Sequence, residues 1–246
     1  MASEYLQWKY RDIQPEEKRP LTGQEKVKNW WHYHKWHLII GILLLASLID
    51  IGKNALGIGI IKPDYQVAYV GTSILPEDAA SALETALAGL GEDCNGDGKV
   101  VVQVNQYVET DSADKGSSDD SYYTYASEVT LLADLEDCES YFFIMQDGET
   151  FQKNYQILSN LDGSLPSEED RDYQTCYLRW EDCPVLSNLD LGDYTESVAG
   201  QEVSGSSQML LTGMHFARRG FWTEKTCENK EGCDVLWEKL TEGAVD

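Results

Sequence analysis

An apolar segment, residues 38–61, constrains the fold of this chain more than any other feature. It begins with the uncharged run 38–49 and continues to Ile61, with Asp50 and Lys53 as its charged residues. Twenty-four residues extend about 36 Å as an α-helix, which exceeds the roughly 30 Å of bilayer hydrocarbon. The uncharged run alone has the length of a buried core helix, so a soluble apolar helix is the alternative.

Aromatic and basic residues before this segment favour the membrane. Trp30, Trp31 and Trp36 crowd its N-terminal edge, where aromatic belts mark membrane interfaces. Residues 1–37 hold seven Lys or Arg against five acids, a net charge of +2, and basic residues stay on the cytoplasmic side. The 37 preceding residues are too long for a cleaved signal, and no lipid-accepting cysteine follows the apolar run. We therefore predict an uncleaved, single-pass signal anchor in the cell membrane.

Three regions follow from this topology. Residues 1–37 form a cytoplasmic tail with a juxtamembrane helix. The capping-box pattern from Thr22 to Glu25 predicts that this helix begins near Gly23. Residues 38–61 form the transmembrane helix, and residues 62–246 form an extracytoplasmic domain. That domain has 37 acids and 11 bases in a chain with a net charge of −24. Such acidity excludes nucleic acid as a partner, because polyphosphate binding needs a basic surface.

The exported region predicts an α/β fold. A β-rich run at 65–70, a helix opened by Pro76 and an alternating valine run at 100–105 form a βαβ unit. The apolar run 141–145 predicts a central strand, and Asp147 predicts the cap of a following helix. Apolar residues at helical spacing close the chain, and they are Cys233, Leu236, Trp237 and Leu240. One three-layer domain with a mostly parallel sheet of at least four strands fits this order.

Two further elements complete this prediction. A helical pattern follows the acidic, serine-rich loop 109–121, and its expected apolar face consists of Tyr122, Tyr125, Val129, Leu132 and Leu135. The run 209–216 predicts the last strand.

A calcium-loop pattern starts at Asp93. Asp93, Asn95 and Asp97 stand at alternating positions before Gly98, like the first half of an EF-hand loop. The backbone carbonyl of Lys99 would be the fourth ligand. The bidentate glutamate of a complete loop is missing, because Val104 occupies its position. Calcium binding and an ion-free tight turn are therefore alternative interpretations.

All six cysteines follow the apolar segment, and an even number on the exported side indicates disulfides whose pairing stays open. Local spacing favours Cys176 with Cys183 and Cys227 with Cys233, which leaves Cys94 with Cys138.

Catalytic motifs are absent from the sequence, which contains no G-x-S-x-G, H-E-x-x-H or phosphate-binding glycine loop. His215 is the one histidine after residue 61, so a Ser-His or Cys-His site would depend on it. Gly52, Ala55 and Gly59 share one helix face with small side chains, which would permit a homodimer within the membrane.

The chain resembles a group of uncharacterised bacterial membrane-anchored proteins. The resemblance rests on the aromatic, histidine-rich segment 30–37, on the strand at 63–71 and on the turn Asn95-Gly96-Asp97-Gly98-Lys99-Val100. It implies a single membrane span and an exported α/β domain, and no activity. The βαβ start also resembles one lobe of extracellular solute-binding proteins at the level of fold order.

Three functions are compatible with this sequence. The first is an anchored binding or interaction protein, with calcium as a stabilising ion and an envelope protein or a ligand as partner. The second is an exported hydrolase that uses acidic residues. The third is a tethered solute-binding module. A cleft at the carboxyl ends of the strands without a pair of carboxylates would favour ligand binding over hydrolysis.

Overall fold

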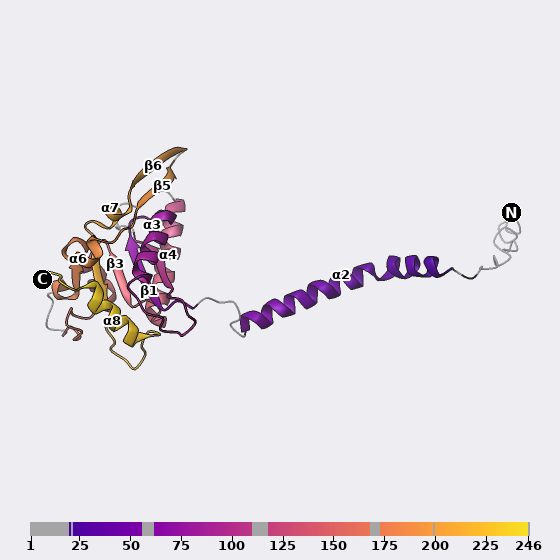
Figure 1. Ribbon diagram of the computed structural model, residues 1–246, viewed down its shortest axis with the longest axis horizontal. Helices are drawn as coiled ribbons and strands as arrows, with labels where there is room; N and C mark the ends of the chain where they lie inside the picture. Colours follow the sequence, from indigo (N-terminus) through magenta and orange to yellow (C-terminus); the bar gives the residue numbers. More distant parts are fainter. Residues whose placement is uncertain are drawn as a thin grey trace, which may run out of the picture. The chain divides into compact units, whose positions relative to one another are not determined.

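The computed structural model describes residues 20, 22–55, 62–109, 118–167, 173–198 and 200–245. The chain forms two compact units, Met1–Ile61 and Lys62–Asp246. Figure 1 shows one long helix in the first unit and a sheet with helices in the second.

The first unit contains helix α2, Gly23–Ala55. It begins at the predicted capping box, where the Thr22 backbone N–H donates to Glu25 Oε2 at 3.0 Å. The helix continues without a break into the apolar segment, and large apolar side chains such as Leu43 and Leu48 are exposed. Within it, Gly23–Lys53 is long and apolar enough to span a membrane. The N-terminus of the chain therefore has a helix compatible with a membrane anchor or a signal sequence.

The second unit is built on a five-stranded mixed sheet. Its strands are β1 (Tyr65–Gly71), β2 (Val102–Val108), β3 (Phe142–Met145), β4 (Tyr177–Arg179) and β7 (His215–Arg218), in the order β2-β1-β3-β7-β4. β1 pairs in parallel with β2 and β3, whereas β7 runs antiparallel to β3 and β4. The predicted α/β fold is confirmed, with β3 in the centre of the sheet.

Helices cover both faces of this sheet, which gives the three predicted layers. On one face, α3 (Glu77–Ala88) and α8 (Lys230–Leu240) pack on Tyr65, Val67 and Tyr69 of β1. On the other face, α4 (Ser118–Asp137) and α5 (Gly148–Tyr155) pack on Ala68 and Val70. The alternation along β1 follows from the two-residue period of a strand. The α5 cap is also confirmed, because Asp147 Oδ1 accepts the Thr150 N–H at 3.0 Å.

The predicted apolar face of α4 is wrong. Of its five members only Leu135 is buried, and the other four are exposed. The buried face instead carries Leu131, Asp134 and Leu135. Hydrogen bonds explain this choice, because Asp134 Oδ2 accepts the Tyr107 hydroxyl at 2.7 Å and Ser127 Oγ accepts the Val108 N–H at 2.6 Å. The polar positions of α4 thus satisfy groups on edge strand β2.

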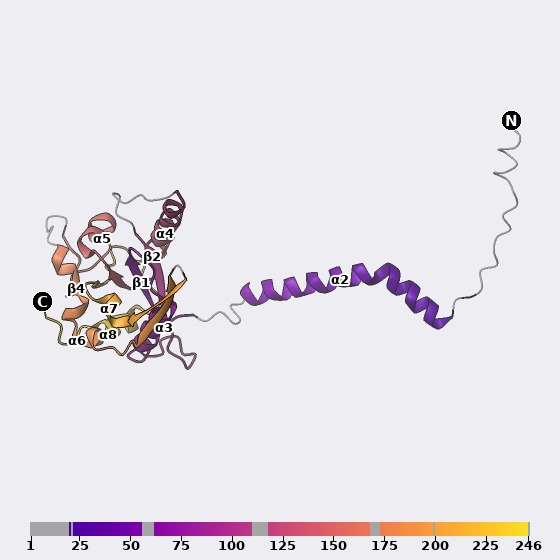
Figure 2. The same ribbon diagram turned by 90° about the horizontal axis from the view of Figure 1, so that it is seen from above.

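The predicted strand at 209–216 is also wrong up to residue 214. Ser207–Leu211 forms helix α7, Gly213 has a φ of +82°, and the strand β7 begins at His215. A short apolar run cannot distinguish strand from helix by periodicity alone. An unpredicted hairpin precedes α7, and it joins β5 (Asp193–Val198) to β6 (Gln201–Ser206). The hairpin stands apart from the five-stranded sheet, beside α3 (Figures 1 and 2).

Short helical segments complete the second unit. They are η1 (Tyr173–Cys176), η2 (Trp180–Asp182) and α6 (Pro184–Ser187). Leu186 of α6 and Trp180 of η2 belong to the same hydrophobic cluster as α3 and α8.

Candidate functional site

The strand order defines a topological switch point between β1 and β3. The chain passes from β1 through α3 to β2 on one side, and then through α4 to β3 on the other side of β1. At the carboxyl end of β1 the chain continues into α3 on one face of the sheet, and at the carboxyl end of β3 it continues into α5 on the other face. The two connections therefore diverge between β1 and β3. Open α/β sheets bind ligands in the crevice at such a point.

A pocket of about 310 Å³ lies at this switch point. We call it the switch-point pocket. Thr72 and Ser73 directly follow β1, and Gln146 directly follows β3. Its volume is at the lower end of the range for small-molecule sites. The complete lining is Tyr69, Thr72, Ser73, Ile74, Leu75, Pro76, Gln146, Tyr194, Glu196, Leu210, Thr212, Gly213 and Met214.

Hydrogen bonds between side chains and backbone hold the walls of this pocket. The Thr72 N–H donates to Gln146 Oε1 at 3.2 Å and ties the two post-strand loops together. The Leu75 N–H donates to Gln106 Oε1 at 2.6 Å, which fixes the loop ahead of α3. On the opposite wall, the Gly213 N–H donates to Glu181 Oε2 at 3.0 Å. The pocket is therefore largely preformed, as small-molecule sites usually are.

Tyr69 is the most informative residue of the pocket wall. The residue is only 5% exposed, yet its hydroxyl has no hydrogen-bond partner among the residues that the structure describes. Burial raises the pKa of Tyr69, so its hydroxyl stays a protonated donor at neutral pH. The hydroxyl oxygen is not among the fully buried polar atoms without a partner, so it opens into the pocket, where water or a ligand can accept its hydrogen bond.

Gly71 explains how the Tyr69 hydroxyl reaches the pocket. A Cβ at Gly71 would lie 2.8 Å from Tyr69 Oη and 3.0 Å from two of its ring carbons, so the Tyr69 side chain would have to shift. The two residues are on the same face of β1, so the phenol ring lies along the strand toward its carboxyl end. The absent side chain of Gly71 thus makes room for the hydroxyl.

The structure places the predicted calcium loop elsewhere, between α3 and β2. Its side chains accept backbone N–H groups: Asp93 from Gly98 at 2.7 Å, Asn95 from Asp97 at 2.9 Å, and Asp97 from Lys99 at 2.9 Å. These bonds match the alternative interpretation, a tight turn. Within the described ranges no three His, Cys, Asp or Glu side chains are grouped as metal ligands. That finding does not test calcium, which stays a prediction.

Asp64 holds this loop against the sheet, and the sequence analysis missed it. The residue is 2% exposed. Its Oδ1 accepts the N–H groups of Cys94 and Asn95 at 2.9 and 3.0 Å, and its Oδ2 accepts that of Val101 at 2.8 Å. A buried carboxylate needs such donors to replace water. No local pattern marks this aspartate, because its partners lie 30 to 37 positions later.

The cysteines do not form the disulfides expected from their even number. All six lie among the described residues, and none of them forms a disulfide there. Cys176 and Cys183 are in different hydrophobic clusters, which separates the proposed local pair. Burial is the main cause that raises the pKa of Cys183 to about 11 and that of Cys227 to about 12. Buried thiols of this kind are weak nucleophiles.

His215 lies outside the switch-point pocket, at the start of β7. Its Nδ1 accepts the Gly148 N–H at 3.2 Å, and its ring contacts that of Tyr177 edge-on at 4.6 Å. Burial lowers the pKa of His215. Neither a serine nor a cysteine is among its partners in the described part of the chain, so the arrangement lacks a nucleophile–base pair.

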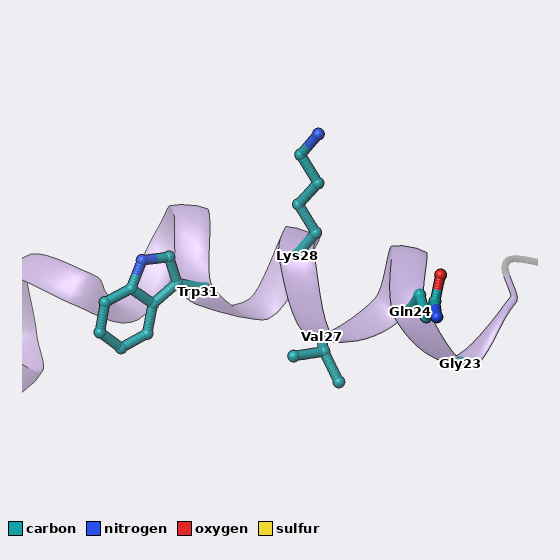
Figure 3. A pocket seen from close by; sticks show the side chains of 5 residues that line it. All are labelled: Gly23, Gln24, Val27, Lys28 and Trp31. Carbon is teal, nitrogen blue, oxygen red and sulfur yellow. The ribbon is translucent and has the colours of Figure 1, made fainter.

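A hollow at the start of α2 is not a comparable site. Figure 3 shows its lining residues, with Val27 and Trp31 along the helix and Lys28 pointing away from Val27. All of the lining comes from Gly23–Trp31 of one helix, so the hollow has no second wall. It is a surface feature of an exposed helix.

The homodimer prediction lies largely outside the described residues. Gly59 is not among them, and the side chain of Ala55 is not described. Small-residue contacts between helices therefore stay a prediction.

Comparisons with protein-family models, with curated proteins and with solved structures found no match for this chain. Proposals about function therefore depend on the chemistry of the switch-point pocket and of the apolar helix.

Proposed function

We propose that this chain is a membrane-anchored ligand-binding protein. In this proposal α2 spans the cell membrane once, with the N-terminus in the cytoplasm. The unit Lys62–Asp246 then lies outside the cytoplasm and binds a small molecule in the switch-point pocket. The unpartnered Tyr69 hydroxyl is the observation that carries the proposal.

The composition of the pocket favours binding over hydrolysis. Glu196 is the one carboxylate among its lining residues. Acid-catalysed glycoside hydrolysis uses two carboxyl groups about 5–9.5 Å apart, and this lining supplies one. A tethered binding module therefore accounts for the pocket better than an exported hydrolase does.

A panel of small molecules tests the binding function. The full chain in lipid nanodiscs is heated with carboxylates, neutral polyols and organic amines, one compound at a time, and unfolding is followed by near-UV circular dichroism. A binder at 100 times its Kd raises stability by about 2.7 kcal/mol, or about 5–10 °C in a unit of this size. We expect the Tyr69→Phe variant to lose most of that shift. If no compound gives a shift that depends on Tyr69, the proposal fails.

Protease digestion of intact cells tests the orientation. The proposal expects the region after Pro63 to be cleaved in intact cells, because the positive residues of the tail stay in the cytoplasm. Protection of that region until the cells are lysed would reverse the orientation.

A protein partner is the second candidate function, and the exposed face of α4 favours it. Tyr122, Tyr125, Val129 and Leu132 form an exposed stripe on this helix. The charged residues of α4 are all acidic, so the stripe suits a partner with a basic rim. A photo-crosslinker at Tyr125 should join α4 to one envelope protein, and one at Thr130, which is also exposed, should not. Equal cross-linking at both positions would refute a specific interface.

A further inference from the structure

The charged residue that lines the switch-point pocket is acidic, and so are the charged side chains that accept hydrogen bonds from its walls. Glu196 is the charged residue of its lining, which contains no Lys, Arg or His. On one wall, Asp78 Oδ2 accepts the Thr195 N–H of the hairpin at 3.3 Å. On another wall, Glu181 accepts the Gly213 N–H. The backbone N–H groups of Glu181 and Gly213 lower the pKa of Glu181, and the charge of Arg179 lowers it further. The carboxylate is therefore ionised at neutral pH.

This charge pattern disfavours an anion, although a helix begins beside the pocket. The N-terminus of α3 attracts negative charge through its free N–H groups and its dipole. Glu77 and Asp78 already supply two carboxylates in its first turn. An added phosphate or carboxylate would meet these like charges without a basic side chain on the pocket wall.

The apolar part of the lining suits a cation with carbon substituents. Two tyrosines, Tyr69 and Tyr194, and the thioether of Met214 border the same space as Glu196. Tyrosine rings attract ammonium groups, and a carboxylate in the same pocket adds direct charge pairing. The Tyr69 hydroxyl can donate a hydrogen bond to an oxygen elsewhere on the ligand.

We propose that the switch-point pocket binds a small organic cation with an ammonium group and an oxygen atom. This inference rests on the proposed ligand-binding function and specifies the chemistry of its ligand. The ammonium group lies between Glu196 and the tyrosine rings, and the oxygen accepts from Tyr69.

A matched pair of probes separates charge from shape. Choline and 3,3-dimethyl-1-butanol have nearly the same shape and the same hydroxyl, but a carbon atom replaces the charged nitrogen in the second. Each is titrated by calorimetry into the full chain in nanodiscs of uncharged lipid. We expect choline to bind at least about tenfold more tightly than its neutral counterpart.

Two variants of the β5–β6 hairpin test whether the Glu196 carboxylate pairs with the ammonium group of the ligand. Glu196→Gln should weaken choline about tenfold and leave the neutral alcohol unchanged. Glu202→Gln is the matched control, because Glu202 pairs with Ser197 whereas Glu196 pairs with Val203, and these two pairs are adjacent in the same hairpin. Adjacent strand positions point to opposite faces, so this control should bind choline as the wild type does.

The outcomes distinguish this inference from the function on which it rests. Equal affinity for both probes, or loss of choline affinity in the Glu202 variant alone, would overturn the organic-cation ligand. If a neutral polyol such as myo-inositol binds in a manner that depends on Tyr69 while choline does not, the ligand class is wrong and the binding function stands. If neither cations, polyols nor carboxylates bind in a manner that depends on Tyr69, both proposals fail.

Discussion

Two adjacent leucines of α4 provide a direct test of its packing. Leu131 is fully buried in the cluster with Leu135 and Phe143, whereas Leu132 is 52% exposed. Replacing each by alanine removes the same atoms from neighbouring positions of one helix. The periodic pattern of the sequence predicts Leu132 as the core residue, and the structure assigns that role to Leu131.

The two substitutions should lower the free energy of unfolding by amounts that differ severalfold. A fully buried leucine loses its transfer free energy and leaves a cavity, so Leu131→Ala should destabilise the second unit by about 2–5 kcal/mol. Leu132→Ala keeps good helix propensity and removes a half-exposed side chain, so its effect should stay within about 0.5 kcal/mol. At about 2–4 °C per kcal/mol, these values correspond to a Tm lower by about 4–20 °C for Leu131→Ala and by less than about 2 °C for Leu132→Ala.

Near-UV circular dichroism of the full chain in detergent measures both values, because this signal reports packed aromatic side chains. Far-UV spectra at low temperature verify that each variant keeps its helices. A larger loss for Leu132→Ala than for Leu131→Ala would refute the orientation of α4. It would also remove the exposed stripe that favours a protein partner.

Three further predictions concern polar groups. Asp64→Asn should lower the free energy of unfolding by about 2–4 kcal/mol, because an amide nitrogen cannot accept the Val101 N–H. Asp97→Asn, at the exposed end of the loop, should lower it by less than about 1 kcal/mol, and urea unfolding measures both values. Burial lowers the pKa of His215 in the folded state, so below pH 6.5 the unfolded chain binds more protons than the folded chain. The Tm should therefore fall as the pH drops below 6.5, and His215→Gln should flatten that part of the Tm–pH curve. Calorimetric titration should show heat from calcium binding that Asp97→Asn reduces, and the absence of heat in the wild type would end the calcium prediction.

Elements whose buried residues form an unbroken apolar run or a regular apolar repeat were predictable from the sequence. The central strand β3 is a fully apolar run, and all four of its residues are buried. The helix α8 repeats its apolar residues at three and four positions, and Cys233, Leu236, Trp237 and Leu240 are all buried. In both cases the local pattern and the packing agree, so no distant residue is needed to decide the outcome.

Elements whose orientation depends on distant partners were not predictable. The face of α4 depends on the N–H of Val108 and the hydroxyl of Tyr107, both in the preceding strand β2. Periodicity weighs apolar residues and ignores such acceptors, so it selected the face with more tyrosine and leucine. The hairpin β5–β6 lacked a signal for a different reason, since its exposed strands contain few apolar residues.

The switch-point pocket could not be predicted from the sequence either, because it also depends on residues that are distant in sequence. The βαβ unit indicates one edge of the sheet, but the switch point exists only because β3 pairs on the far side of β1. In the sequence, Gly71 indicates only the end of a strand. In the structure the same residue also makes room for the Tyr69 hydroxyl, a second function that a one-dimensional pattern cannot contain.

If residues 62–246 bind a cation as proposed, a few nearby acids attract it rather than the total negative charge of this region. At physiological ionic strength the Debye length is about 8 Å, so most of the 37 acids in residues 62–246 are screened from a ligand in the pocket. Glu196 borders that space, and Asp78 and Glu181 bond to its walls. A cation held by these neighbours should lose only part of its affinity when salt is raised from 0.15 to about 0.5 M. Loss of nearly all binding in that range would instead assign the attraction to the diffuse negative surface, and the pocket would have no specific charge recognition.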